Sequence, residues 1–313
     1  MQKAWVYEEY GPKEVLKLGE IPIPTTLEDD QLLVQVRAAA LNTIDSKRRQ
    51  LAIFPSGLPA VPGCDMAGVV VGKGSRVAKL EVGDQVYGNI QNFNEPEKLK
   101  KLGTLAEYVA VEEQHVALKP SQLSFEEAAS LPLALQTAIE GFKNAKFKEG
   151  DSVFVVGGAG GVGTLVVQLA KQHFGAFKVV ATCSTSKVEF VKSLGADMVV
   201  DYTTTKYQDI EEKFDFVYDT IGDSKNSIVV AKEEAPVVDI TWPPSNPKVI
   251  YSSLTGRGES LEKLKSCLES GKIKAMIDPS GPYHFKDVIS AFGHLETGRA
   301  RGKVVVTSFP LFG

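Results

Sequence analysis

The fold of this chain is decided by the stretch Val153-Phe154-Val155-Val156-Gly157-Gly158-Ala159-Gly160-Gly161-Val162-Gly163. Its first four residues predict a buried strand, and the apolar pattern of residues 163–173 predicts a helix directly after the glycine-rich turn. A second strand is expected at 178–181, which completes a βαβ unit. A glycine run alone is often only a flexible turn. Inside a βαβ unit, however, it lets the backbone approach a pyrophosphate, and the helix offers unpaired N–H groups to that anion. The stretch therefore predicts a dinucleotide site at Gly157, Gly160, Gly161, Val162 and Gly163.

The alternation of strands and helices continues beyond this unit. The pattern predicts a helix at 187–194 and strands at 198–200, 214–218, 237–240 and 249–252. Strands that alternate with helices along a chain form parallel sheets with helices on their faces. The part of the chain after Gly150 is therefore predicted to be α/β, a Rossmann-type doubly wound parallel sheet. The tail adds helices near 261–271 and 285–295 and a strand at 304–306.

The part of the chain before this sheet has a different pattern. From Trp5 to about Val116, short β-rich runs are separated by Gly and Pro, which predicts a mostly antiparallel β domain. A helix is then expected to begin at Ser124, where Glu127 has the spacing of a capping-box partner.

Length and composition limit the function further. A chain of 313 residues is long enough for two hydrophobic cores, and a cleft between them is the expected ligand site. No run approaches the roughly 20 apolar residues of a membrane helix, and the net charge of −4 argues against a nucleic-acid partner. Three scattered cysteines do not suggest a disulfide framework. The N-terminus begins in strand-like sequence without an apolar signal region, so the expected location is cytoplasmic.

The end of the second Rossmann strand bears on which nicotinamide cofactor is bound. An Asp or Glu at this position holds the ribose hydroxyls of NAD, but residues 181–187 contain no acid. Hydroxyls and a lysine can instead hydrogen-bond and neutralise a 2′-phosphate. The pattern favours NADPH, with Ser184, Thr185 and Lys187 as contacts. An N-capped helix start with an exposed lysine is the alternative interpretation.

Several segments together resemble a known family, the quinone oxidoreductase branch of the medium-chain dehydrogenase/reductase superfamily. The resemblance covers nearly the whole chain and is carried by Ala40 through Arg48, Val61 through Val70, Val82 through Gly88 and Gly157 through Thr164. Within that branch the chain is most similar to the plant enone oxidoreductases, which reduce an exocyclic methylene furanone. Residues 4–7, 129–134, 214–219, 261–265 and 299–306 carry this closer likeness.

The resemblance implies a GroES-like β-barrel domain, completed by the C-terminal tail, with the Rossmann domain inserted in it. The expected boundaries are 1–122 with 273–313 for the GroES-like domain and 123–272 for the NADPH-binding domain. The resemblance also implies that Lys47 lies near substrate and cofactor and that Tyr202 lies near the adenosine phosphate. The remaining implied cofactor contacts are Ile240, Ser252, Ser253, Leu254 and Arg299. Residues 232–236 and 241–245 depart from the pattern of the relatives, so the resemblance does not identify which enone this chain reduces.

Zinc-dependent members of the superfamily polarise an alcohol with a bound metal. This sequence has Asn42 where the first ligand would fall and Cys64-Asp65 where a His-Glu pair would fall, so no metal is expected. Without a Lewis acid, alcohol oxidation is disfavoured. Conjugate reduction requires only a placed hydride donor and hydrogen-bond donors at the developing oxyanion.

Lys47 is the first candidate for that donor and hence the candidate catalytic residue. Backbone N–H groups or a tyrosine hydroxyl are alternatives, and a plain surface lysine beside Arg48 and Arg49 is the non-functional interpretation.

The sequence thus predicts zinc-independent, NADPH-dependent reduction of the carbon–carbon double bond of an α,β-unsaturated carbonyl compound. A quinone reductase is the alternative enzyme, and an NADPH-binding protein without catalysis is the alternative from another class. The expected partner is a small enone, alkenal or quinone rather than a nucleic acid or a membrane. Monomer and homodimer both remain open.

Overall fold

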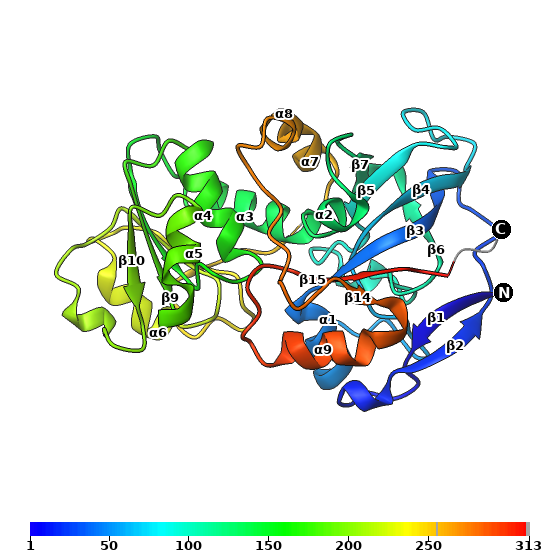
Figure 1. Ribbon diagram of the computed structural model, residues 1–313, viewed down its shortest axis with the longest axis horizontal. Coiled ribbons are helices and arrows are strands. Elements are labelled where there is room, and N and C mark those ends of the chain that lie inside the picture. The colour runs from blue at the N-terminus through cyan, green and yellow to red at the C-terminus, as the bar shows by residue number, and fades with distance from the viewer. Residues whose placement is uncertain (255, 311–313) are drawn as a thin grey trace. The chain divides into compact units, whose positions relative to one another are not determined.

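The computed structural model describes residues 1–254 and 256–310, and the chain divides into two compact units (Figure 1). Unit 1 comprises Met1–Leu133, Thr255–Glu269 and Ala275–Gly313, and unit 2 comprises Ala134–Leu254 and Ser270–Lys274. The sheet of unit 1 is mostly antiparallel and that of unit 2 is parallel, which confirms both predicted architectures.

A seven-stranded sheet forms the body of unit 1, in the order β14-β15-β3-β4-β5-β7 with β6 paired to β3; a smaller antiparallel sheet joins β1 to β2. The strands are β1 (Gln2–Val6), β2 (Lys17–Ile21), β3 (Gln31–Leu41), β4 (Asp65–Lys73), β5 (Gln85–Asn89), β6 (Tyr108–Glu112), β7 (Val116–Leu118), β14 (Tyr283–His284) and β15 (Val304–Thr307). The helices are α1 (Thr43–Leu51), α2 (Phe125–Ala129), α7 (Glu259–Lys263), α8 (Lys265–Glu269) and α9 (Val288–Glu296).

The long strand β3 organises unit 1. Its burial alternates, with Leu32, Val34 and Val36 fully buried, as expected of a strand with one face on a core. Strand β15 pairs antiparallel with the end of β3, which brings the C-terminal tail into the sheet of the N-terminal segment. The predicted capping box at α2 is confirmed, because Ser124 Oγ accepts from the N–H of Glu127 at 3.1 Å and Glu127 Oε2 accepts from that of Ser124 at 2.8 Å.

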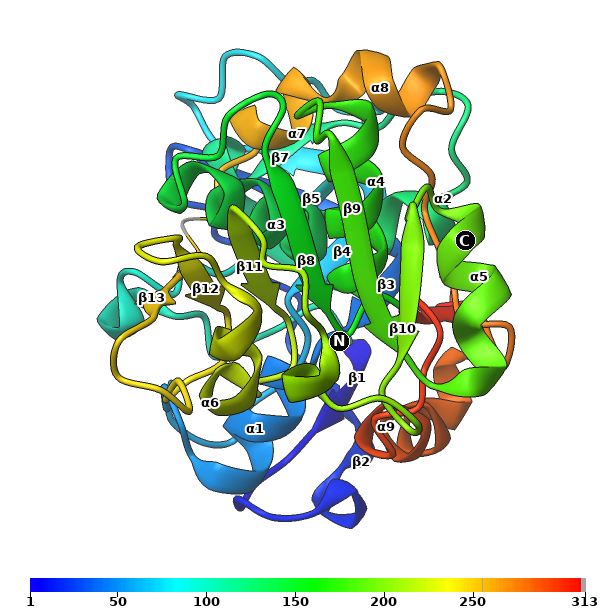
Figure 2. The ribbon, with the colours of Figure 1, turned by 90° about the vertical axis from the view of Figure 1, so that its left-hand side faces the viewer.

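Unit 2 is a six-stranded parallel sheet in the order β10-β9-β8-β11-β12-β13 (Figure 2). Its strands are β8 (Ser152–Val156), β9 (Lys178–Cys183), β10 (Met198–Asp201), β11 (Phe216–Asp219), β12 (Val237–Asp239) and β13 (Ile250–Tyr251). Its helices are α3 (Pro132–Asn144), which begins in unit 1, and α4 (Gly163–Gln172), α5 (Val188–Ser193) and α6 (Ser224–Ser227). The order reverses between β8 and β11, and ligands of doubly wound sheets bind at the carboxyl ends of the strands beside such a switch point.

Aromatic side chains fill one face of the unit 2 sheet. Phe142 of α3 stacks on Phe174 at 4.3 Å between ring centroids and meets Phe216 of β11 edge-on at 5.5 Å. The hydroxyl of the buried Tyr218 donates to the carbonyl of Thr137 at 2.7 Å, so its one polar group is satisfied. This packing holds β11 in place beside β8, and the candidate cofactor loop follows β8.

The compact units differ from the predicted domain boundaries mainly in the assignment of three helices: α2, α7 and α8 belong to unit 1. The start of α7 approaches unit 1 closely, because a Cβ on Gly258 would lie 2.2 Å from the carbonyl oxygen of Val116 in β7, and α2 packs against β3 and β4. The boundaries at 122/123 and 272/273 themselves stay a prediction. In the described residues, each helix is too short or too polar to cross a bilayer.

Candidate functional site

The glycine loop between β8 and α4 closes in a way that only glycine permits. Gly157 has a φ of +81°, and a Cβ there would lie 2.6 Å from Ile221 Cγ2. A Cβ on Gly163 would lie 2.0 Å from the carbonyl oxygen of Gly157. The N–H of Gly157 donates to Thr182 Oγ1 of β9 at 3.0 Å, which fixes the loop to the neighbouring strand.

The open side of this loop has the chemistry of an anion site. A Cβ on Gly160 would meet only the carbonyl oxygen of Gly157, at 3.5 Å, so the backbone there is accessible. In the described residues, the N–H groups of Gly161, Val162 and Gly163 donate to no protein group, and they stand at the start of α4. Unpaired N–H groups and the helix dipole together attract a phosphate, so the loop fits a dinucleotide diphosphate.

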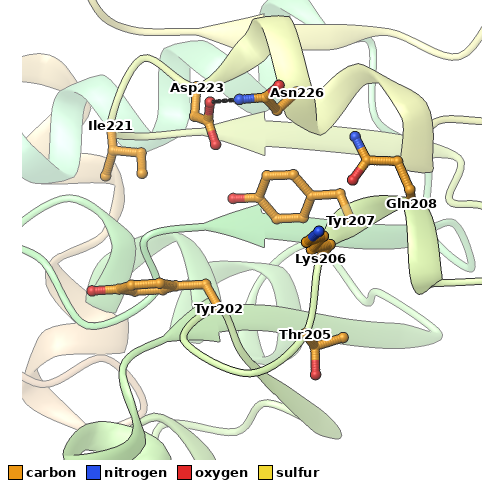
Figure 3. A pocket seen from close by; sticks show the side chains of 8 residues that line it. All are labelled: Tyr202, Thr205, Lys206, Tyr207, Gln208, Ile221, Asp223 and Asn226. Atoms are coloured by element: carbon orange, nitrogen blue, oxygen red, sulfur yellow. Dashed lines mark hydrogen bonds between the residues drawn. The ribbon is translucent and has the colours of Figure 1, made fainter.

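A pocket of about 360 Å³ lies at the carboxyl edge of the same sheet. It begins where β10 and β11 end, and one of its residues, Ile221, also packs on the glycine loop. Figure 3 shows Asp223 and Asn226 joined by a hydrogen bond of 2.6 Å above the ring of Tyr207. The lining residues are Tyr202, Thr205, Lys206, Tyr207, Gln208, Ile221, Asp223 and Asn226.

The lining combines aromatic faces with polar groups. The ring of Tyr202 is 55% exposed, whereas Tyr207 is 9% exposed and its hydroxyl interacts with Thr182 and Asp223. Burial raises the pKa of Tyr207 and keeps it neutral. An aromatic wall with adjacent amide, ammonium and carboxylate groups suits a flat, polar ring such as a nucleobase.

The residues predicted to contact the ribose 2′-phosphate of NADPH directly follow β9. Ser184 is half-buried, Thr185 is exposed and Lys187 is half-buried, in the 3₁₀ turn η4 (Thr185–Lys187) and the residue before it. The carboxylate of Asp201, the last residue of the neighbouring strand β10, lies beside them. Its Oδ2 accepts from Thr185 Oγ1 at 2.5 Å. Hydrogen bonds from Thr185 and Thr203 lower the pKa of Asp201, so a carboxylate faces this site.

The late cofactor contacts that the resemblance implies follow β12 and β13. Ile240 is half-buried directly after β12. Ser252 is 5% exposed and its hydroxyl accepts from Asn144 at 2.9 Å, so this side chain is already engaged within unit 2. Ser253 is half-buried and Leu254 is 6% exposed. All four belong to unit 2, with the glycine loop and Tyr202.

The other predicted site residues, Lys47 and Arg299, belong to unit 1. Lys47 lies half-buried on α1, and in the described part of the chain its ammonium has no hydrogen bond or ion pair. Its neighbours are engaged: Arg48 donates to Ser56 at 2.9 Å, and the fully buried Arg49 pairs with Glu296 at 2.5 Å. Lys47 is therefore set apart from the basic run in which it occurs. Arg299 is exposed in the segment that follows α9, which ends at Glu296.

The start of α1 contacts a buried polar cluster. Cys64 Sγ donates to Asp45 Oδ1 at 3.0 Å, and Asp45 Oδ2 accepts from the N–H of Asn42 at 2.8 Å. The ammonium of Lys303 in the tail donates to Asn42 Oδ1 and to Asp65 Oδ2. Burial raises the pKa of Asp65, and the Lys303 ammonium opposes that rise.

Sequence reasoning named Tyr202 but missed the other residues that line the pocket, as well as Asp201 and Lys303. The sequence marks Tyr207 and Asp223 as site residues only by their place after predicted strands, because no motif links them. Lys303 and Asp65 are 238 positions apart, so their pairing depends on the tertiary fold.

Comparison with known proteins adds two family matches. Residues 28–121 match the model of the alcohol dehydrogenase GroES-like domain, and residues 194–306 match the model of the zinc-binding dehydrogenase family. These matches agree with a GroES-like unit followed by a Rossmann unit.

Individual relatives are similar over almost the whole chain. The 2-methylene-furan-3-one reductase of Solanum lycopersicum is 51% identical over 98% of this chain and 79% of its own length. The chloroplastic NADPH-dependent alkenal/one oxidoreductase of Arabidopsis thaliana is 48% identical over 98% of this chain and 80% of its own. Among solved structures, the quinone oxidoreductase of Coxiella burnetii superposes with a TM-score of 0.88 at 32% identity, over 98% of this chain and 99% of its own.

Proposed function

Because this chain belongs to the medium-chain dehydrogenase/reductase superfamily, in its quinone oxidoreductase branch, we propose that it reduces the carbon–carbon double bond of α,β-unsaturated carbonyl compounds with NADPH. The observation that carries the proposal is the 51% identity with a methylene-furanone reductase over 98% of the chain. The 48% identity with an NADPH-dependent alkenal/one oxidoreductase supports the same reaction and the same cofactor. The substrate class is accordingly enone or alkenal.

NADPH supplies the hydride when it is bound, and unit 2 supplies groups that fit it. The N–H groups of Gly161, Val162 and Gly163, which have no hydrogen-bond partner among the described residues, suit the diphosphate. The pocket beside Tyr202 suits the adenine, and Ser184, Thr185 and Lys187 suit the 2′-phosphate. Ile240, Ser252, Ser253 and Leu254 of unit 2, together with Arg299 of unit 1, complete the proposed contacts.

Lys47 is the proposed hydrogen-bond donor to the carbonyl oxygen of the substrate. Negative charge develops on that oxygen as the β-carbon is reduced, so a cation there stabilises the transition state more than the ground state. Its lack of a partner in the described residues supports the role, because an ammonium engaged elsewhere would have to break a bond first. A backbone N–H or a tyrosine hydroxyl remains the alternative donor.

The reaction is proposed to be zinc-independent. Asn42, Cys64 and Asp65 are the residues that would have to bind the metal, and each is committed to a protein partner. Burial, followed by the charge of Asp45, raises the pKa of Cys64 well above its ordinary value, so the thiolate that zinc requires is disfavoured. The ammonium of Lys303 already neutralises Asp65.

Quinone reduction is the second candidate. The TM-score of 0.88 with a quinone oxidoreductase favours it, since the same cofactor arrangement serves both acceptors. The two activities separate only by the acceptor that is turned over.

Cytoplasmic location and assembly as a monomer or homodimer belong to this proposal as well. A fluorescent fusion of the full-length protein expressed in plant cells tests the location, and signal confined to chloroplasts would contradict it. Light scattering of the purified protein distinguishes the two assembly states.

The test is oxidation of NADPH and NADH with methylene furanones, linear enones, alkenals and quinones. Enone turnover that prefers NADPH is expected. Lys187→Ala should raise the KM for NADPH about ten-fold with little effect on NADH, and Lys47→Ala should lower kcat about a hundred-fold. Lys192→Ala, a surface lysine paired with Glu189 on α5, is the matched control and should change neither value. Turnover of quinones alone would favour the second candidate.

A further inference from the structure

A lysine ammonium is buried in unit 1 at a place where the proposed reaction does not use it directly. Lys303 is 5% exposed, and its Nζ lies 3.1 Å from Oδ2 of the fully buried Asp65. It also donates to Oδ1 of Asn42, which is 7% exposed. Burying a charge is costly unless it is paired and hydrogen-bonded, so such an arrangement persists only with complete partners.

The partners are complete. Asp65 Oδ2 also accepts from Asn42 Nδ2 at 2.9 Å, and Asp65 Oδ1 accepts from the N–H of Leu133 at 2.8 Å. Both halves of the Asn42 amide are therefore held by charged groups, the oxygen by an ammonium and the nitrogen by a carboxylate. This fixes the orientation of the amide, because a flipped amide would place its NH₂ against Lys303 and its oxygen against Asp65.

The fixed amide stands at the N-cap of α1. The side chain of Asn42 contacts Lys303 and Asp65, and the side chain of Asp45 closes the first turn by accepting from the N–H of Asn42 at 2.8 Å. Cys64 holds the other oxygen of Asp45. The start of the helix is thus held from two sides, and Lys47 lies two residues beyond Asp45 on the same helix.

The backbone of Lys303 is equally constrained. Its N–H donates to the carbonyl of Met276 at 2.7 Å, and its carbonyl accepts from the N–H of Asp278 at 2.9 Å. One residue thus connects the returning tail, the start of β4 at Asp65 and the start of α1.

We propose that Lys303 is a positioning residue of the reduction, whose ammonium fixes the Asn42 amide and so holds the start of α1 and Lys47 in place. This inference rests on the proposed function for its kinetic consequence. Small displacements of a catalytic group lower the rate of the reaction while leaving cofactor binding intact.

Lys303→Met removes the charge and keeps the length of the side chain. We expect kcat for the enone to fall about ten-fold or more, with the Kd of NADPH changed less than two-fold because most proposed cofactor contacts lie in unit 2. Lys303→Arg, which keeps the charge and the donors, should retain more of kcat than Lys303→Met. Lys100→Met removes the ammonium of another ion pair of unit 1, that with Glu112, and is the matched control: it should keep wild-type kcat.

A second variant separates positioning from stability. Lys303→Met leaves Asp65 buried without its cation, so the protein should unfold at lower urea, and Lys303→Met with Asp65→Asn should regain much of that loss. If Lys303 positions α1, kcat of the double variant stays low although stability returns. Recovery of kcat in step with stability, or wild-type kcat in a folded Lys303→Met, would overturn the proposal.

Hydrogen exchange provides a measurement that does not depend on activity. In the folded double variant, the amides of residues 43–47 should exchange at least several-fold faster than in wild type, while those of α4 stay unchanged. Unchanged exchange at 43–47 would also refute the inference. If wild type reduces no enone but this exchange pattern appears, the proposed function fails and the role of Lys303 in holding α1 stands.

Discussion

The three cysteines lie in different surroundings, which matters for an enzyme whose substrates react with thiolates. Cys64 is fully buried and its thiol donates a hydrogen bond to Asp45, and burial raises the pKa of the thiol well above the ordinary value. Cys183 is 2% exposed, and burial, together with the charge of Asp201, raises its pKa to about 11. Cys267 is half-buried on α8.

A reactive alkenal should therefore modify Cys267 first. The thiolate adds to the β-carbon, and solvent protonates the α-carbon, so each adduct increases the mass by one alkenal. At neutral pH we expect one adduct on the folded protein, at Cys267, and three adducts after denaturation. Peptide mapping identifies the site, and Cys267→Ser is the control that should abolish the fast adduct. Modification of Cys64 at a comparable rate in the folded protein would contradict this account.

The negative charge of Asp201 should have a measurable effect on the KM for NADPH. Its carboxylate accepts from Thr185 at 2.5 Å and from Thr203 Oγ1 at 2.7 Å, at the site proposed for the 2′-phosphate. Because its pKa is lowered, it is ionised at neutral pH and repels that phosphate. Asp201→Asn should lower the KM for NADPH about two- to five-fold and leave that for NADH nearly unchanged, an effect that salt reduces.

Glu233→Gln is the matched control for Asp201→Asn, since it removes an exposed negative charge elsewhere in unit 2. It should leave the KM for NADPH unchanged. A rise in the KM for NADPH in Asp201→Asn would mean that Asp201 positions Thr185 for the phosphate rather than opposing it.

At the scale of secondary-structure elements, Asp215 connects the start of β8 to the start of β11. It accepts from the N–H of Ser152 at 2.9 Å, from Ser152 Oγ at 2.6 Å and from Lys232 Nζ at 2.6 Å. Burial raises the pKa of Asp215, but these donors outweigh it and lower the pKa to about 2 from 3.8. Since the folded-state pKa is depressed, the stabilisation is present above the unfolded value and is lost as the pH falls from about 4 toward 2.

Asp215→Asn should lower the free energy of unfolding by about 1 kcal/mol at pH 7, a value discounted for solvent screening at this partly exposed site. The difference from wild type should shrink at pH 3. Urea unfolding at both pH values measures it, with Glu189→Gln as a surface ion-pair control expected to be near zero. A difference that grows on acidification would show that the sign of the linkage is wrong.

Elements with strong local patterns could be predicted from sequence. The strand at 153–156 and the helix after the glycine loop occur within one residue of their predicted bounds, because a buried parallel strand and an amphipathic helix each carry their own periodicity. The predicted helix near 261–271 is instead two short helices that break at Leu264. The first of them, α7, packs against β7, and periodicity does not report such tertiary contacts.

The candidate site divides in the same way. The glycine loop was predictable because its backbone geometry demands particular residues at fixed spacing. The pocket around Tyr207 and Asp223 was not, because its residues come from separate loops that meet only when the parallel sheet forms. The acid beside Thr185 was missed for a related reason: Asp201 lies on the adjacent strand, paired in register with Cys183.

At the scale of the whole molecule, the proposed functions are divided between the two units. Unit 2 carries the glycine loop, the pocket and the ribose contacts, whereas unit 1 carries Lys47 and the Lys303 cluster that holds its helix. Reduction of the double bond requires that the hydride is delivered to the β-carbon of the substrate and not to its carbonyl carbon.

The fate of that hydride is the most direct test of the account. NADPH carrying deuterium at the transferred position is turned over with a linear enone, and the product is examined by NMR. The account predicts a saturated ketone with one deuterium on the carbon β to the carbonyl. Deuterium on the carbonyl carbon, with the double bond intact, would show reduction to an allylic alcohol and would contradict the central claim.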